Sequence, residues 1–373
     1  MNKILQSMLI TVMVLFTAGQ FSVHAHQVST PQLTSEAAIL IDGKSGQVLY
    51  EKNAEQKMYP ASITKIVTAI IAIEQGNLLE TVTVSENATA ADGTRVYLVE
   101  DEEVYLERLV QGLMINSGND AGTAIAEHMA GSEEAFSAKM NQFVKEEIGA
   151  ENSNFTNPHG LYHEDHYTTA HDMAMIAKYA MENETFREIA GTKEMEWNGE
   201  GWETTIYNHH RLLWDYEGTT GVKNGFVSQA GFTLVTSADK DGRELIAVTL
   251  KAPTAEISYD DTIKLFDYGF ENYYTEEIAE DAVFESTDGT EYQLGAEAYV
   301  TLAADTNMEK EVDDEFLVVR GEDGSVLLEK ELIPLKDSSE TEEENDELHK
   351  EEDAEVEVQQ TNWLQRILSL FNL

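Results

Sequence analysis

Apolar and polar positions follow a spacing that changes twice along this chain. Residues 37–50 hold two short β-type runs around a Gly-containing loop, which predicts a hairpin. Residues 221–250 return to β-type runs, and a helical stretch over 254–273 follows. Between them the spacing is helical, with apolar stripes over 60–73, 106–114, 121–128, 133–148 and 169–181. This order predicts an α/β fold of the α+β type, in which the N-terminal hairpin pairs with the later strands of an antiparallel sheet covered by helices.

Beyond residue 274 the helical spacing disappears. Residues 275–336 carry short β-type runs separated by turn residues, which predicts a small all-β domain. Residues 337–360 are acidic and nearly free of apolar side chains, which is typical of a disordered linker. Residues 361–373 place apolar side chains on one helical face: Trp363, Leu364, Ile367, Leu368 and Phe371. This stretch is too short to span a bilayer, and we expect an anchor helix lying in a membrane surface; a helix docked on the protein itself is the alternative.

The first 25 residues have the pattern of a secretory signal. A basic start at Lys3 precedes an apolar stretch over 9–18 and a small-residue site that ends at Ala25. We therefore expect an exported protein whose mature chain begins at His26. With the anchor helix, the expected location is the outer face of the bacterial cytoplasmic membrane or the cell wall.

Composition excludes several functional classes. The sequence contains no cysteine, which excludes thiol catalysis, thiolate metal sites and disulfides. The formal net charge of −46 excludes a nucleic-acid partner, because a phosphate backbone attracts the opposite sign.

The first candidate for chemistry lies at the start of a predicted buried helix. Pro60 suits the first turn of a helix, and the run 66–73 behind it has no sustained polar face. Ser62 and Lys65 share one face of that turn because they are three residues apart. A serine hydroxyl becomes nucleophilic when a base takes its proton, and burial lowers the pKa of a lysine enough to make it that base. For this motif alone, a buried helix with an ordinary Ser and Lys in its cap region is the alternative.

Two further motifs favour the catalytic interpretation. Ser117-Gly118-Asn119 is predicted in a tight loop between two helices, and Lys223-Asn224-Gly225 on a β-strand. The motifs Ser-x-x-Lys, Ser-Asp-Asn and Lys-Thr-Gly occur together in penicillin-binding proteins and β-lactamases. Their order and their predicted local structure both match here. The chain resembles the D-alanyl-D-alanine carboxypeptidases, the low-molecular-weight penicillin-binding proteins of the serine-type D,D-peptidase family.

The resemblance covers about residues 31–273. The segments 157–161, 166–170 and 267–270 are also similar to that family. For residues 26–274 it implies a catalytic domain with a β-lactamase/transpeptidase-like sheet and a helical subdomain. A small β domain and an amphipathic anchor often follow in this family, which is the layout predicted here.

The resemblance implies a role for each motif residue in removing the terminal D-alanine from a peptidoglycan stem peptide that ends in D-Ala-D-Ala. Ser62 is expected to attack the peptide carbonyl and to become acylated, with Lys65 as its general base. Ser117 would pass a proton to the leaving D-alanine, and Asn119 would bind the substrate amide. The same chemistry implies β-lactams as covalent inhibitors, and no cofactor.

The third motif is implied to bind the substrate. Lys223 would attract the terminal carboxylate, next to Asn224 and Gly225, and the backbone N–H groups of Ser62 and Phe226 would form the oxyanion hole. The family usually has Thr where this chain has Asn224. An amide also offers hydrogen-bond donors, so we expect activity to be retained, while the effect on substrate affinity and β-lactam sensitivity stays open.

Other interpretations of the same residues remain. A β-lactamase shares the acylation step and needs a carboxylate and a water to release the acyl group. A D,D-endopeptidase would need an open cleft, and a non-catalytic scaffold at the wall would not need intact Ser62 and Lys65. A metallohydrolase is suggested by four histidines, but no His-Glu-x-x-His helix is present, so we expect no metal site. The histidines are His159, His163, His166 and His171; His159 is expected at the rim of the active site, and two others, His209 and His210, at the surface.

Overall fold

The structure is a computed structural model that describes residues 29–335. The predicted signal, the acidic linker 337–360 and the anchor helix 361–373 therefore lie outside the described residues. The chain divides into two units, 1–33 and 34–373. In the first unit, the described residues 29–33 have no regular structure, and the elements below all belong to the second unit.

The helices and strands follow one another in the predicted general order. The helical elements are a 3₁₀ helix (Ala61–Thr64), α2 (Lys65–Gln75), α3 (Glu86–Thr89), α4 (Leu106–Ile115), α5 (Asn119–Ala130), α6 (Glu133–Phe143), a π-helical turn (Val144–Ile148), α7 (Ala170–Glu182), α8 (Glu184–Gly191), α9 (Leu212–Asp215) and α10 (Ala255–Asn272). The strands up to α10 are β1 (Ala37–Asp42), β2 (Val48–Lys52), β3 (Thr81–Thr83), β4 (Glu103–Tyr105), β5 (Glu194–Asn198), β6 (Glu203–Tyr207), β7 (Thr219–Val227), β8 (Gly231–Lys240) and β9 (Arg243–Ala252).

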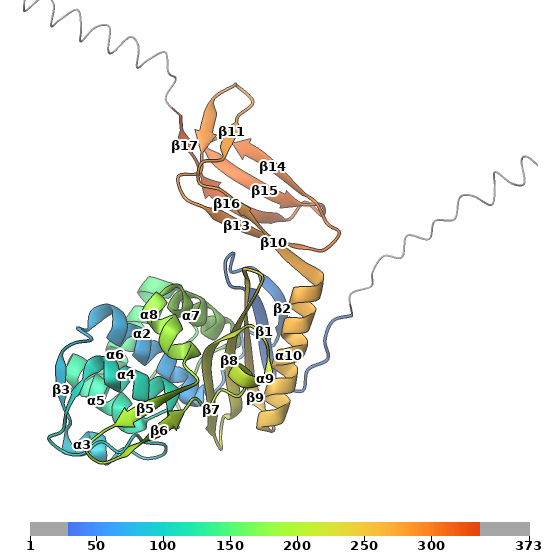
Figure 1. The fold of residues 1–373 in the computed structure, drawn as a ribbon. Coiled ribbons are helices and arrows are strands. Elements are labelled where there is room, and N and C mark those ends of the chain that lie inside the picture. The colour runs from blue at the N-terminus through green and yellow to red at the C-terminus, as the bar shows by residue number, and fades with distance from the viewer. Residues whose placement is uncertain (1–28, 336–373) are drawn as a thin grey trace, which may run out of the picture. The chain divides into compact units, whose positions relative to one another are not determined.

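The central sheet is antiparallel and has the order β2-β1-β9-β8-β7. Its N-terminal hairpin pairs with a late strand, with Ile39 opposite Val248, which confirms the predicted topology. Every residue of β1 is buried, because α10 covers one face of the sheet and the helices around α7 cover the other (Figure 1). A strand covered on both faces favours a continuous apolar run, which is the pattern of 37–41. Strand β7 is an edge strand of this sheet.

The helical half of the core surrounds α2. Residues 65–72 of α2 are all buried, in keeping with the apolar character of that segment. Two predicted helices differ in detail. The helix predicted to start near Pro60 begins with the 3₁₀ helix, so Ser62 lies in a 3₁₀ turn and Lys65 opens the α-helix. The stripe predicted over 133–148 ends as an α-helix at Phe143 and continues as a π-helical turn.

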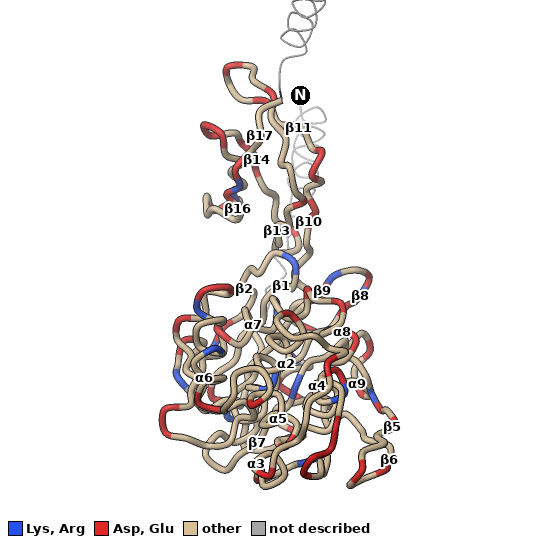
Figure 2. Tube along the Cα trace, turned by 90° about the vertical axis from the view of Figure 1, so that its left-hand side faces the viewer, with Lys and Arg blue, Asp and Glu red and all other residues tan. Residues whose placement is uncertain are grey.

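The strands after α10 form a small β-rich region with its own apolar core. They make three small sheets, β10-β13, β11-β12-β17 and β14-β15-β16. The strands are β10 (Tyr273–Ile278), β11 (Val283–Glu285), β12 (Glu291–Gln293), β13 (Ala298–Ala303), β14 (Met308–Asp313), β15 (Phe316–Gly321), β16 (Val326–Glu331) and β17 (Ile333–Pro334). Val300, Leu317 and Val319 are among the fully buried residues of this core. Acidic residues are spread along the chain in both regions (Figure 2). Within residues 29–335, no helix combines the length and the apolar character that crossing a membrane requires.

Candidate active site

The first motif brings its two functional groups into contact. The Nζ atom of Lys65 lies 3.1 Å from the Oγ atom of Ser62. The Lys65 side chain is completely buried, while Ser62 keeps part of its surface exposed. Ser62 is therefore partly accessible to solvent, whereas the Lys65 amine is shielded from water.

Two carbonyl oxygens also accept hydrogen bonds from the Lys65 amine. Its Nζ atom donates to the side-chain Oδ1 of Asn119 and to the backbone oxygen of His159, both at 2.7 Å. Burial, together with the nearby positive charge of Lys223, lowers the pKa of Lys65 well below its ordinary value. A lysine in this environment is poised to be neutral and to accept a proton.

The second motif lies directly beside this amine. Ser117 is buried and has a left-handed backbone with φ of +61°, which turns the chain sharply between α4 and α5. Asn119 is the first residue of α5. Its Nδ2 donates to the carbonyl of Asp92 at 2.6 Å, so both ends of its amide are engaged within the protein.

A buried carboxylate fixes the segment that covers this loop. Asp120 is completely buried and accepts hydrogen bonds from the backbone N–H groups of Val96, Leu98 and Ala121. Burial raises the pKa of Asp120, and these backbone donors oppose that rise. The carboxylate thereby holds residues 96–98 against the start of α5.

The third motif approaches Ser62 from the edge strand β7. Lys223 is buried, and its Nζ atom donates to the backbone oxygen of Asn224 at 2.9 Å and to its Oδ1 at 3.3 Å. Burial lowers the pKa of Lys223 to about 7. A Cβ atom on Gly225 would lie 2.7 Å from the backbone nitrogen of Ser62, so only glycine allows the strand this close. Phe226 follows with its side chain half exposed, packed against Phe232.

A further segment, 157–161, contacts the chain at Ala61 and the Lys65 amine. A Cβ atom on Gly160 would lie 1.9 Å from the carbonyl oxygen of Ala61, and Gly160 has a φ of +86°. The same segment supplies the His159 carbonyl that accepts from Lys65. The sequence indicated this segment only through its similarity to a family, and nothing in it marked that carbonyl as a ligand of the amine.

Of the predicted site residues, the structure brings Lys65 and Gly225 against Ser62, and Asn119 against Lys65. It corrects one expectation. His210 was expected at the surface and is completely buried, where its Nε2 lies 2.9 Å from Thr236 Oγ1. No element was predicted for residues 197–214. They include the end of β5, all of β6 and most of α9. His159 is also buried, and its Nε2 lies 3.4 Å from the Glu133 carboxylate.

A family model described as D-alanyl-D-alanine carboxypeptidase matches residues 24–254. The chain belongs to this family. Its members are serine-type hydrolases of peptidoglycan metabolism, and the fold class predicted from the sequence agrees with this membership.

Individual relatives agree with the family. D-alanyl-D-alanine carboxypeptidase DacF of Bacillus subtilis is 36% identical over 284 residues, which is 74% of this chain and 72% of the relative. DacC of Escherichia coli is 36% identical over 287 residues, covering 72% and 71%. The solved structure of penicillin binding protein 5 from Haemophilus influenzae superposes with a TM-score of 0.74 at 28% identity, covering 83% of this chain and 99% of the other.

Proposed function

We propose that this chain removes the terminal D-alanine from peptidoglycan stem peptides through an acyl-enzyme on Ser62. The observation that carries the proposal is the contact between a fully buried, pKa-lowered Lys65 amine and the Ser62 hydroxyl at 3.1 Å. A neutral amine in this position takes the hydroxyl proton as the oxygen attacks the carbonyl of the penultimate D-alanine.

The oxygen of that carbonyl becomes an oxyanion in the tetrahedral intermediate. We assign the backbone N–H groups of Ser62 and Phe226 to it, because the Gly225 contact holds β7 within reach of the Ser62 nitrogen. The C–N bond then breaks, and the leaving D-alanine amine receives a proton through Ser117. Water hydrolyses the resulting ester and regenerates Ser62.

The substrate carboxylate is assigned to Lys223 and Asn224. The Oδ1 atom of Asn224 accepts from Lys223, which leaves its Nδ2 without a hydrogen bond among residues 29–335. That donor and the Lys223 ammonium together suit a terminal carboxylate. Asn119 orients Lys65 through its Oδ1, and the second N–H of its Nδ2 is assigned to the substrate amide.

Intact-protein mass spectrometry after brief exposure to benzylpenicillin tests the nucleophile. We expect a persistent adduct on the wild type, none on Ser62→Ala, and release of D-alanine from a peptide ending in D-Ala-D-Ala by the wild type only. Rapid loss of the drug without an adduct would identify a β-lactamase instead. An intact drug, no adduct and no D-alanine release would leave the non-catalytic scaffold as the better description.

We propose in addition that the enzyme is exported and is held at the membrane surface by residues 361–373. The support is the sequence pattern alone: a signal-like start and an apolar helical face that includes Ile367. Membrane fractionation of Ile367→Asp tests the anchor, with Ser369→Asp on the polar face as the matched control. Both variants add one negative charge, and only Ile367→Asp should release the protein into the soluble fraction. Equal membrane retention of the two variants would contradict the proposal.

A further inference from the structure

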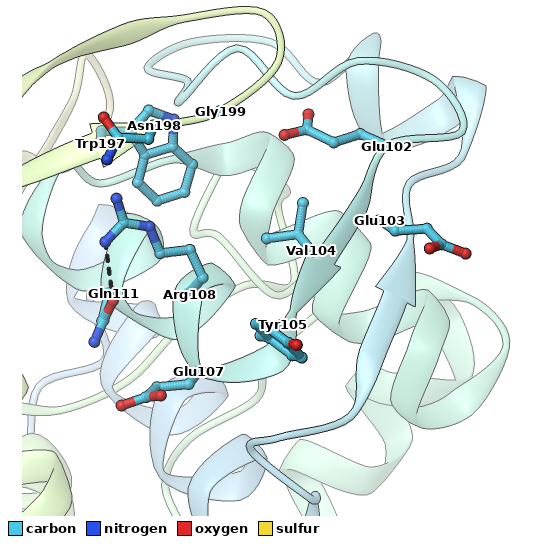
Figure 3. A pocket seen from close by; sticks show the side chains of 10 residues that line it. All are labelled: Glu102, Glu103, Val104, Tyr105, Glu107, Arg108, Gln111, Trp197, Asn198 and Gly199. Carbon is cyan, nitrogen blue, oxygen red and sulfur yellow. Dashed lines mark hydrogen bonds between the residues drawn. The ribbon is translucent and has the colours of Figure 1, made fainter.

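A pocket of about 410 Å³ lies outside the Ser62 cluster, between α4, β4 and the β5 strand. Its lining includes Glu102, Glu103, Glu107, Arg108, Trp197 and Gly199 (Figure 3). None of these residues takes part in the site described above. The volume is within the usual range of pockets for small molecules.

One wall of the pocket presents the Arg108 guanidinium, on which the charge of Glu107 acts without a direct ion pair. Arg108 projects from α4, with its guanidinium carbon 4.8 Å from the centre of the Trp197 ring. It donates to Gln111 Oε1 at 3.4 Å and to the backbone oxygen of Glu196. Within residues 29–335 its guanidinium has no carboxylate at ion-pair distance, although acids outnumber basic residues 70 to 24 in the chain.

The opposite wall presents a buried carboxylate. Glu102 is only 4% exposed, and its two oxygens accept from the backbone N–H groups of Val99 at 2.9 Å and Glu200 at 3.0 Å. A carboxylate has lone pairs for further donors. Figure 3 shows the Glu102 carboxylate directed into the pocket, across from Arg108 and Trp197. The fold thus fixes two opposite charges on facing walls without pairing them.

A third polar group of the lining belongs to Trp197, the ring against which Arg108 packs. Trp197 is 1% exposed, and its indole Nε1 has no hydrogen bond among the described residues. A Cβ atom on Gly199 would lie 2.8 Å from that nitrogen and 3.4 Å from Glu102 Oε1. Glycine at this position therefore keeps the space between the indole and the carboxylate open.

We propose that this pocket binds a small zwitterion, an amino acid or short peptide with a free ammonium group and a free carboxylate. The ligand carboxylate pairs with the Arg108 guanidinium, and the ammonium pairs with Glu102. An anion without an ammonium group would meet the acidic lining of Glu102, Glu103 and Glu107. A cation without a carboxylate would leave the half-buried guanidinium unpaired. Only a ligand with both charges satisfies both walls.

Isothermal titration of the full-length Ser62→Ala protein with D-alanyl-D-alanine tests the proposal, because this variant prevents turnover. We expect saturable binding that weakens at least about tenfold in Arg108→Gln and in Glu102→Gln, since each loses one charge-assisted hydrogen bond. Arg320→Gln, which removes the same charge in the C-terminal β region, is the matched control and should bind like the parent.

Two blocked dipeptides separate the two charges of the ligand. N-acetyl-D-alanyl-D-alanine lacks the ammonium, and D-alanyl-D-alaninamide lacks the carboxylate, so we expect each to bind the pocket at least about tenfold more weakly. The same titrations are made in a Ser62→Ala/Lys223→Ala background, which removes the proposed carboxylate site beside Ser62. Binding that persists in this background and is lost on Arg108→Gln reports on the pocket alone, independently of the proposed catalytic function. Parent-like affinity in a folded Arg108→Gln protein, or no saturable binding up to about 50 mM, would overturn the proposal. If Glu102→Gln fails to fold, Gly199→Ala replaces it, because its methyl group narrows the same space and should also weaken binding.

Discussion

The side-chain oxygen of Asn119 lies 2.7 Å from the amine of Lys65, which also contacts Ser62. With the His159 carbonyl it occupies two N–H bonds of that amine. A neutral amine has two N–H bonds and one lone pair, so the lone pair is left for the Ser62 hydroxyl at 3.1 Å. The uncharged Asn119 amide is therefore compatible with a neutral Lys65 amine, whereas a carboxylate at the same place would stabilise the ammonium form.

Asn119→Asp should therefore raise the pKa of Lys65. We expect acylation by benzylpenicillin near pH 7 to slow by about 100-fold, in the range by which a general base contributes, and to recover as the pH rises. The measurement is the pH profile of the acylation rate. Asn119→Ala is the control: it loses the orientation of the amine without adding charge, so its acidic limb should not move to higher pH. Identical profiles for the two variants would contradict this account of the amine.

Lys223 should set the alkaline limit of substrate binding. Burial lowers the pKa of Lys223 to about 7, so the side chain loses its charge as the pH rises through this value. We expect KM for a peptide ending in a free carboxylate to increase above pH 7, with a smaller effect on kcat. Lys223→Arg keeps the cation, because a guanidinium stays protonated, and should give a flat KM over the same range. A wild-type KM that stays constant from about pH 6 to about pH 9, a range that includes the pKa of Lys223, would argue against a role for this charge.

Asn224 should contribute a donor to the substrate carboxylate. Its Oδ1 accepts from Lys223 at 3.3 Å, and its amide nitrogen is the group left for the ligand. Asn224→Ala removes that donor, and we expect KM to rise about tenfold or more, as for a hydrogen bond to a charged group. Asn224→Thr supplies a hydroxyl donor and should keep KM near that of the wild type. If Asn224→Ala retains wild-type KM, the carboxylate is bound without this residue.

The sequence predicted the sheet and the main helices from local patterns, and the resemblance to a family indicated that the three motifs share one site. Ser62 and Lys65 are close in sequence, and the long β runs around Lys223 are unambiguous. The partners of Lys65 were not predictable, since the Asn119 side chain comes from 54 residues away and the His159 carbonyl from 94. Every residue carries a backbone oxygen, so the residue type at position 159 does not indicate that its carbonyl contacts Lys65. His210 was misplaced because a polar side chain in an irregular segment gives no periodic signal of burial.

The pocket beside Trp197 could not be predicted for a related reason. Glu102, Arg108 and Trp197 lie in segments with no shared motif, and the hairpin that carries Trp197 had no clear pattern. In a chain with 70 acidic residues, a single buried glutamate is not distinguishable from the solvated ones by sequence. The backbone N–H groups of Val99 and Glu200 compensate for the burial of this carboxylate, and only the fold brings both of them to Glu102.

Gly160 should be required for the site to form, through a close contact and not through flexibility. A Cβ atom there would lie 1.9 Å from the Ala61 carbonyl, next to the nucleophile, and the φ of +86° disfavours any side chain. Gly131 is the matched control, since its φ is +83° and nothing lies within 4 Å of its Cβ position. We expect Gly131→Ala to cost about 1 kcal/mol of unfolding free energy with unchanged acylation. Gly160→Ala should destabilise further and lose most acylation by benzylpenicillin, because the 3₁₀ turn that carries Ser62 must move. Denaturant unfolding and acylation rates of both variants check this, and equal behaviour would show that backbone conformation alone fixes glycine at this position.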